Sequence, residues 1–327
     1  NEKGIKGICI ITAGFKETGA AGAELEKELV EKIHSYGMRC VGPNCLGVVN
    51  THPDVRMDGC FAESLPERGN IGFVSQSGAL GGGILNILKD LNLGFAQFIS
   101  IGNQADVNAE TALEYWENDE DVEQILLYME SIQNPANFRK LASRISRKKP
   151  VLALKAGRSA AGASAASSHT GSLAGADKAA NALLKQSGVI REYSLKNLFA
   201  TAKVFANCPI PQGDRVAIIT NSGGPGIMAT DAISEYGMQM AKITDETKEK
   251  LRSFLPSAAS VKNPIDMIAS APIEHYKQTL ETVIADPNVD MIITIYLPFL
   301  GLKDIDVAQA LMEIKAQHPE KPIIGVF

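Results

Sequence analysis

Short apolar runs alternate along the chain with longer stretches in which apolar positions recur every three or four residues. The short runs predict buried strands and the longer stretches predict amphipathic helices, a pattern typical of parallel sheets with crossover helices. Helices are expected at about 21–36, 80–89 and 135–147, and another should begin near 176. Strands are expected at 8–12, 39–41, 71–74, 95–100, 124–128, 151–154, 189–191, 216–220, 291–296 and 322–327. The pattern therefore predicts an α/β fold.

The predicted elements fall into three blocks. Residues 1–65 contain a strand, a helix and a strand, followed by an irregular passage rich in Pro, Asp and Gly. The second block, 66–208, holds five strand candidates, and the third, 209–327, opens within the linker-like segment Cys208-Pro-Ile-Pro-Gln-Gly213. The chain begins without Met and stops within an apolar strand pattern, so we expect a fragment of a longer polypeptide.

Two loops, one in each of the last two blocks, share one design. Each places an apolar strand before a polar pair, then Ser-Gly, then a helix. Such a helix start presents unpaired amide groups, a hydroxyl and the positive end of the helix dipole, which together bind phosphate or another oxyanion. A strand-to-helix turn also favours Gly and Ser for conformational reasons alone. The predicted phosphate-binding residues are Ser75, Gln76, Ser77, Gly78, Ala79, Ser222, Gly223, Gly224 and Gly226.

His169 lies in a segment almost without bulk. Between residues 156 and 176, 17 of 21 side chains belong to Gly, Ala or Ser. Such a loop cannot pack a core, so we expect it to bring backbone and one imidazole close to a ligand, although a flexible tether has a similar composition. It connects a strand to a helix, where open α/β sheets place their sites.

His169 could act as a general base, a metal ligand or a nucleophile. Further metal ligands are missing nearby in the sequence, whereas the oxyanion loops supply a phosphoryl group as the electrophile. A nucleophilic imidazole needs an acceptor that fixes its tautomer. Glu130 follows the strand at 124–129 and should lie at the same sheet edge, although a solvated strand-end carboxylate is the simpler interpretation. His34, His52, His275 and His318 are interpreted as structural or exposed.

Two further turns carry polar residues that could serve a site. Asn44, in Gly42-Pro-Asn-Cys-Leu-Gly47, could orient a substrate amide or phosphate, or simply suit an Asn/Gly turn. Asn263-Pro-Ile-Asp266 is a turn of the same kind, with low specificity.

Composition narrows the function classes. A net charge of −5 argues against nucleic acid, and the absence of Gly-Lys-Ser/Thr and Gly-x-Gly-x-x-Gly disfavours a kinase and a nicotinamide dehydrogenase. Five cysteines without CxxC spacing argue against a disulfide framework and a zinc site. No segment resembles a membrane span or a signal peptide. We expect a cytoplasmic protein that binds neither nucleic acid nor membranes.

The motifs together resemble the ADP-forming (NDP-forming) acyl-CoA synthetases, relatives of succinyl-CoA synthetase, and in particular their alpha subunits. The resemblance covers nearly the whole chain in that family's order. Its segments are Gly42-Pro-Asn-Cys-Leu-Gly47, Gly72-Phe-Val-Ser-Gln-Ser-Gly-Ala-Leu80, Tyr128-Met-Glu-Ser131, Lys155-Ala-Gly-Arg-Ser159, Ser167-Ser-His-Thr-Gly-Ser-Leu-Ala174, Thr220-Asn-Ser-Gly-Gly-Pro-Gly226 and Asn263-Pro-Ile-Asp266. It implies the remnant of a Rossmann-like CoA-binding domain (1–65) and two flavodoxin-like, doubly wound domains, 66–208 with the phosphohistidine and 209–327 truncated at its end.

The resemblance also implies a reaction: acyl-CoA, ADP and phosphate are interconverted with acid, CoA and ATP through an acyl phosphate and a phosphohistidine. His169 would carry the phosphoryl group, Glu130 would orient it, and the two Ser-Gly loops would hold the phosphate. Residues expected near substrate or CoA are Asn44, Cys45, Ser168, Thr170 and Gly171.

Much of that machinery is expected outside this sequence. ATP or ADP and Mg²⁺ should bind an ATP-grasp domain or beta-type subunit, so the fragment should hold no cofactor tightly and should be inactive alone. A homo- or hetero-oligomer is expected. Two alternatives are a regulatory module of a protein-lysine acetyltransferase fusion and a non-catalytic CoA-binding module. Retention of His169 favours the enzyme, because the regulatory versions lose this histidine.

Overall fold

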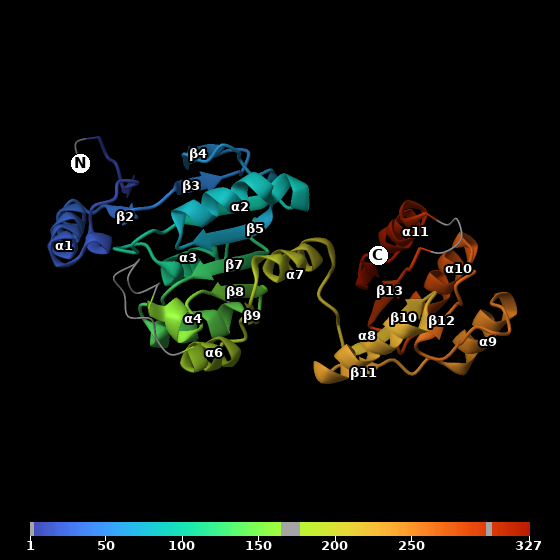
Figure 1. The fold of residues 1–327 in the computed structure, drawn as a ribbon. Helices are drawn as coiled ribbons and strands as arrows, with labels where there is room; N and C mark the ends of the chain where they lie inside the picture. Colours follow the sequence, from blue (N-terminus) through green and yellow to red (C-terminus); the bar gives the residue numbers. More distant parts are fainter. Residues whose placement is uncertain (1–2, 165–176, 299–302) are drawn as a thin grey trace. The chain divides into compact units, whose positions relative to one another are not determined.

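The protein forms two compact units along its chain. A computed structural model describes residues 3–164, 177–298 and 303–327. Unit 1 comprises residues 1–206 and unit 2 residues 207–327 (Figure 1). Within the described residues, none of the helices has both the length and the apolar character needed to cross a membrane.

The core of unit 1 is a seven-stranded sheet. Its strands are β3 (Gly47–Asn50), β4 (Met57–Cys60), β5 (Arg68–Ser75), β6 (Phe95–Ser100), β7 (Gln124–Met129), β8 (Val151–Lys155) and β9 (Ile190–Glu192). They lie in the order β4-β3-β6-β5-β7-β8-β9, with β5 to β9 parallel. In chain order the parallel strands follow 2-1-3-4-5, the flavodoxin-like arrangement.

Helices cover both faces of this sheet. They are α2 (Gly78–Leu91), α3 (Ala109–Trp116), α4 (Pro135–Ile145), α6 (Asp177–Gln186) and α7 (Leu195–Asn207). Apolar side chains of α2 and α7 pack on one face around Phe73 and Leu126. Those of α3, α4 and α6 pack on the other around Ile125 and Leu127. Because both faces are covered, the strands are continuous apolar runs, which is why the sequence predicts them well.

Asparagine residues cap two of these helices at their amino ends. Asn108 accepts a hydrogen bond from the Thr111 amide at 2.9 Å and so begins α3. Asn134 does the same for Asn137 at 3.0 Å, and Pro135 occupies the first turn of α4. Each cap satisfies one of the amides that a helix leaves unpaired.

The first part of unit 1 is a small parallel β–α–β arrangement. It contains β1 (Gly7–Cys9), the 3₁₀ helix η1 (Lys16–Thr18), α1 (Ala20–Ser35) and β2 (Arg39–Val41). From the sequence we expect an irregular passage after β2. This is wrong for two segments, β3 and β4, which are strands. These strands pair antiparallel, and β3 joins them to β6 in the large sheet. Residues 47–60 of the first predicted block are thus part of the second block's sheet.

Unit 2 is also a parallel sheet with helices on both faces, but it has fewer strands. Its elements are β10 (Arg215–Thr220), α8 (Gly223–Glu235), β11 (Gln239–Met240), α9 (Asp245–Phe254), β12 (Ile265–Asp266), α10 (Ile273–Ile284), β13 (Met291–Ile295), α11 (Asp304–Gln317) and β14 (Ile323–Val326). The sheet order is β11-β10-β13-β14, all parallel, and β12 pairs with the end of β10. Helix α8 packs on one face and α9, α10 and α11 on the other.

Candidate active site

The connections of the unit 1 sheet diverge between β5 and β7. These strands are neighbours, but β5 continues through α2 to β6 on one side, and β7 continues through α4 to β8 on the other. Open α/β sheets bind ligands outside the carboxyl ends of the strands at such a point. The residues that follow the two strands are Gln76 and Ser77 after β5, and Glu130 and Ser131 after β7.

The turn from β5 into α2 is held by two serines. Ser75 Oγ donates to the Ser77 carbonyl at 2.7 Å, and Ser77 caps α2 by accepting from the Leu80 amide at 3.3 Å. Gly78 and Ala79 are the first residues of α2, and amides at those positions have no partner inside a helix. The helix start can therefore offer N–H groups and the positive dipole end to an anion.

Gln76 ties the two strand-end loops together. Its side chain is buried, and Oε1 accepts from the amides of Glu130 at 2.7 Å and Ser131 at 3.0 Å. Its Nε2 donates to Ser131 Oγ at 3.2 Å. Glu130, the predicted partner of the histidine, is thereby fixed by its backbone directly beyond β7 and beside the start of α2. Burial raises the pKa of Tyr128, and the charge of Glu130 adds to this shift.

The turn Gly42–Gly47 packs on the start of α2. A Cβ atom on Gly78 would lie 3.3 Å from the Leu46 amide nitrogen, and this amide donates to Ser100 Oγ at 2.9 Å. Asn44 and Cys45, two residues expected near substrate, therefore flank the predicted phosphate-binding helix start. Asn44 adopts a left-handed backbone conformation with φ of 56°, which Asn tolerates better than most residues.

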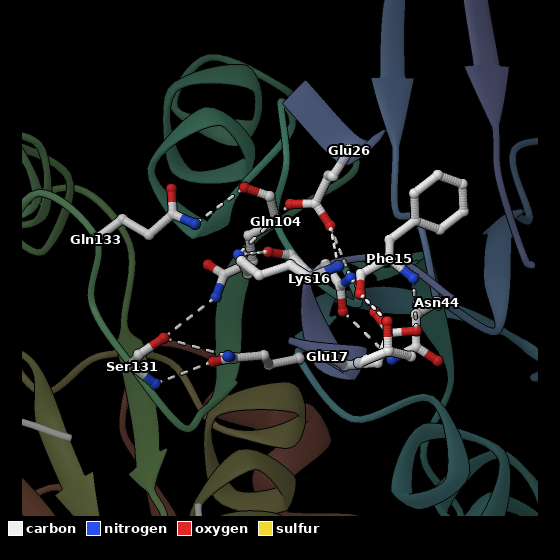
Figure 2. Close-up of polar contacts among 11 residues, drawn as sticks. Phe15, Lys16, Glu17, Glu26, Asn44, Gln104, Ser131 and Gln133 are labelled. Atoms are coloured by element: carbon white, nitrogen blue, oxygen red, sulfur yellow. Dashed lines mark hydrogen bonds and ion pairs between the residues drawn. The ribbon is translucent and has the colours of Figure 1, made fainter. Parts of the chain in front are cut away.

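A loop that sequence reasoning missed joins this turn to the amino-terminal part of the unit. Asn103 is buried, and its Nδ2 donates to Glu26 Oε2 at 2.7 Å and to Glu17 Oε2 at 2.5 Å. Its Oδ1 accepts from Asn44 Nδ2 at 3.2 Å, and Lys16 Nζ donates to its carbonyl at 2.7 Å (Figure 2). One asparagine thus links α1, η1 and the turn Gly42–Gly47.

The next residue, Gln104, reaches the other strand-end loop. It is 3% exposed and left-handed, with φ of 57°. Figure 2 shows its side chain directed at Ser131, with Nε2 to Oγ at 3.5 Å, while Gln133 Nε2 donates to its carbonyl at 2.9 Å. The Gly-Asn-Gln sequence after the strand at 95–100 was the available signal for this loop.

The segment with the predicted histidine lies outside the described residues. On its amino-terminal side, Lys155 ends β8, is 4% exposed and donates from Nζ to the Ala156 carbonyl at 2.6 Å. Burial lowers the pKa of Lys155, and the charges of Asp177 and Glu130 oppose this shift. On the other side, Asp177 opens α6 and forms an ion pair with Arg191. The predicted residues that are not described are Ser168, His169, Thr170 and Gly171.

Unit 2 builds its strand-end loop in a similar way, although the Ser222 side chain makes no capping hydrogen bond. Thr220 Oγ1 donates to the Ser222 carbonyl at 2.8 Å, as Ser75 does in unit 1. Asn221 takes the place of Gln76: its Oδ1 accepts from the Leu297 amide at 2.9 Å and its Nδ2 donates to the Leu297 carbonyl at 2.7 Å. Ser222 is the amino cap of α8, which begins with Gly223, Gly224 and, after Pro225, Gly226.

The polar residues of the turn Asn263-Pro-Ile-Asp266 have different contacts. Asn263 Oδ1 accepts from the Ile218 amide at 2.9 Å, and its Nδ2 donates to two backbone carbonyls, so this side chain serves the sheet. Asp266 instead lies against α8, where a Cβ on Gly223 would be 3.2 Å from Oδ2. Within residues 3–164, 177–298 and 303–327, no group of three or more His, Cys, Asp or Glu side chains could hold a metal ion.

Family models match both units. A succinyl-CoA ligase like flavodoxin domain matches residues 68–205, and a Ligase-CoA domain matches residues 216–326.

Relatives match over nearly all of the chain. It is 45% identical to the alpha subunit of ADP-forming acetate–CoA ligase II from Pyrococcus furiosus, covering all of this chain and 71% of that subunit. It is 41% identical to ADP-forming acetate–CoA ligase I from Archaeoglobus fulgidus, covering 95% of this chain but only 45% of that protein. Acetyl-coenzyme A synthetase 1 of Ca. Korarchaeum cryptofilum, solved with phosphate and ADP, superposes with a TM-score of 0.93 at 35% identity, covering 99% of this chain and 70% of that one.

Proposed function

The chain belongs to the ADP-forming acyl-CoA synthetase family, and we propose that it supplies the acyl and phosphoryl transfer sites of such an enzyme. The reaction interconverts acyl-CoA, ADP and phosphate with acid, CoA and ATP. The acid–CoA ligase names of the relatives support this function over the regulatory and non-catalytic alternatives.

One observation carries the proposal: the start of α2, Glu130 and the Asn44–Cys45 turn meet at the point where the strand connections of unit 1 diverge. The contacts of Gln76 and Gly78 place them within one loop cluster. A helix start can hold a phosphoryl group, and a carboxylate can hold an imidazole in one tautomer. This combination suits phosphoryl transfer to a histidine.

In the proposed reaction, phosphate attacks the thioester carbon of acyl-CoA, and CoA leaves as the acyl phosphate forms. His169 then attacks the phosphorus, and the P–O bond to the acyl group breaks to release the acid. Glu130 accepts a hydrogen bond from the other ring nitrogen and keeps the attacking nitrogen unprotonated. The start of α2 contributes about 0.3–2 kcal/mol to holding the anion, in addition to its direct N–H bonds.

The phosphoryl group must finally reach ADP on a partner. We assign nucleotide and Mg²⁺ to an ATP-grasp domain or beta-type subunit. The relatives named as alpha subunits support a partner subunit of this kind. On this assignment the protein acts in an oligomer.

The test is phosphorylation of the assembled enzyme. With acyl-CoA and labelled phosphate, we expect an acid-labile, base-stable label on His169 that His169→Asn abolishes. Glu130→Gln should fold normally and accept the label at least about tenfold more slowly, as expected for loss of an oriented general catalytic group.

His52→Asn is the matched control, because His52 lies in unit 1 beside Asp121, at 3.3 Å, and outside the candidate site. It should label like the wild type. A folded wild-type enzyme that accepts no label would refute the proposal and favour a regulatory module. Labelling of Glu130→Gln at the normal rate would remove Glu130 from the mechanism.

A further inference from the structure

In both units a side-chain carboxamide joins the two strand-end loops at the point where the strand connections diverge. We call this bridge the carboxamide lock; it is Gln76 after β5 in unit 1 and Asn221 after β10 in unit 2. In unit 2, Asn221 bonds the amide and the carbonyl of Leu297, so backbone groups satisfy both ends of its side chain. In unit 1, Gln76 accepts from two backbone amides but donates to the hydroxyl of Ser131. The carboxamide of unit 2 therefore joins the two loops without a hydroxyl group, whereas that of unit 1 also contacts the hydroxyl of Ser131.

The contacts of Gln76 determine how that hydroxyl is used. Because Oε1 of Gln76 accepts two backbone N–H bonds, the other end of its amide is the NH₂ group, which can only donate to Ser131 Oγ. Gln104 Nε2 approaches the same oxygen at 3.5 Å. Ser131 Oγ thus accepts from both amide groups, and neither contact uses its own hydrogen. Among the described residues, no hydrogen bond donated by Ser131 Oγ is seen.

This hydroxyl lies beside the predicted phosphate-binding helix start. Ser131 follows Glu130 directly, and its amide shares the Gln76 oxygen with the Glu130 amide. Gln76 in turn precedes Ser77, the cap of α2, so the hydroxyl lies in the same loop cluster as the helix start. A hydroxyl that accepts from two donors is polarised toward donating its own hydrogen.

We propose that Ser131 binds substrate, with its Oγ–H donating to an anionic phosphoryl oxygen held at the start of α2. The assignment rests on the proposed function, and it adds a residue to the phosphate site. Gln76 and Gln104 are positioning residues on this view, since they act through Ser131.

The test is phosphate binding and use by the assembled enzyme. Ser131→Ala should weaken binding of inorganic phosphate, measured by calorimetry, about 10- to 100-fold, as expected for loss of a hydrogen bond to a charged group. The KM for phosphate in CoA release from acyl-CoA should rise by the same factor, while the KM for acyl-CoA stays within about twofold. Ser131→Thr keeps the donor and should restore binding.

Ser146→Ala is the control, because Ser146 in unit 1 donates to the Ser187 carbonyl at 2.8 Å outside the site. It should bind phosphate normally. If Ser131→Ala misfolds, Ser131→Cys keeps the size of the side chain but donates weakly, and it should show the same loss. Wild-type phosphate affinity in a folded Ala or Cys variant overturns the assignment. Absence of phosphate-driven CoA release in a wild type that binds phosphate instead overturns the proposed function.

Discussion

The Gln76 lock can be tested by its effect on the stability of unit 1. Gln76→Ala removes the acceptor of the Glu130 and Ser131 amides, which Oε1 contacts at 2.7 and 3.0 Å. Leaving a buried N–H without a partner costs about 1–3 kcal/mol, and partial access of water to these loops favours the lower end. We therefore expect unit 1 to lose about 2–4 kcal/mol. For a unit of this size that corresponds to a fall of roughly 5–15 °C in its thermal midpoint.

The assay should locate the effect as well as measure it, because a protein of two units need not unfold in one step. Hydrogen exchange followed by mass spectrometry should show faster exchange in a peptide that contains Glu130 and Ser131. Gln76→Glu keeps an oxygen for both amides and should leave their protection nearly intact. Asn221→Ala should instead deprotect the Leu297 amide in unit 2.

The reasoning would be wrong if Gln76→Ala left both the midpoint and the exchange of residues 130 and 131 unchanged.

Three further outcomes can be checked. Gly72→Ala should destabilise unit 1 by about 1–3 kcal/mol in urea unfolding, because its Cβ would lie 2.9 Å from a fully buried tryptophan ring, and an unchanged midpoint would contradict this packing. Hydrogen bonds from Arg215 lower the pKa of Asp290 from 3.8 to about 2, so this pair stabilises unit 2 above about pH 4, and the stabilisation is lost as the pH falls toward 2. Asp290→Asn should therefore remove about 1 kcal/mol of the stability difference between pH 6 and pH 3, and an unaltered difference would exclude the pair as its source. The Cys9 and Cys45 sulfurs lie 3.7 Å apart, and their contact lowers the pKa of Cys9 and raises that of buried Cys45. Iodoacetamide should therefore label Cys9 first. Preferential labelling of Cys45 would show that the two pKa shifts are assigned the wrong way round.

The sequence predicts the parallel strands well because burial on both faces gives them unbroken apolar runs. It fails for β3 and β4, which are short and contain Gly, Asn and Asp. In β3 buried residues alternate with half-buried ones, and its pairing with β6 depends on residues far away in the chain. A four-residue alternation in a passage rich in turn residues is too weak a signal to separate from a loop.

The site shows the same division. Strand-end loops with Ser-Gly are visible in the sequence because the strand, the turn and the helix are all local. The contribution of Asn103 is not visible, because its partners Glu17 and Glu26 lie 86 and 77 residues away. The left-handed backbone of Gln104 is equally hidden, since a non-glycine residue adopts it only where tertiary contacts impose it.

The structure also changes what the glycine at the start of α2 can be taken to mean. From sequence, Gly78 suggests a backbone that an oxyanion must approach closely. In the folded unit, the Cys45–Leu46 backbone already lies against that position, so packing alone requires a small residue there. The glycine is therefore weak evidence for a ligand. The hydrogen bonds of Gln76 are stronger evidence for a ligand. They fix Glu130 and Ser131 beside the helix start, and they do not use the hydrogen of the Ser131 hydroxyl that we propose donates to an anion.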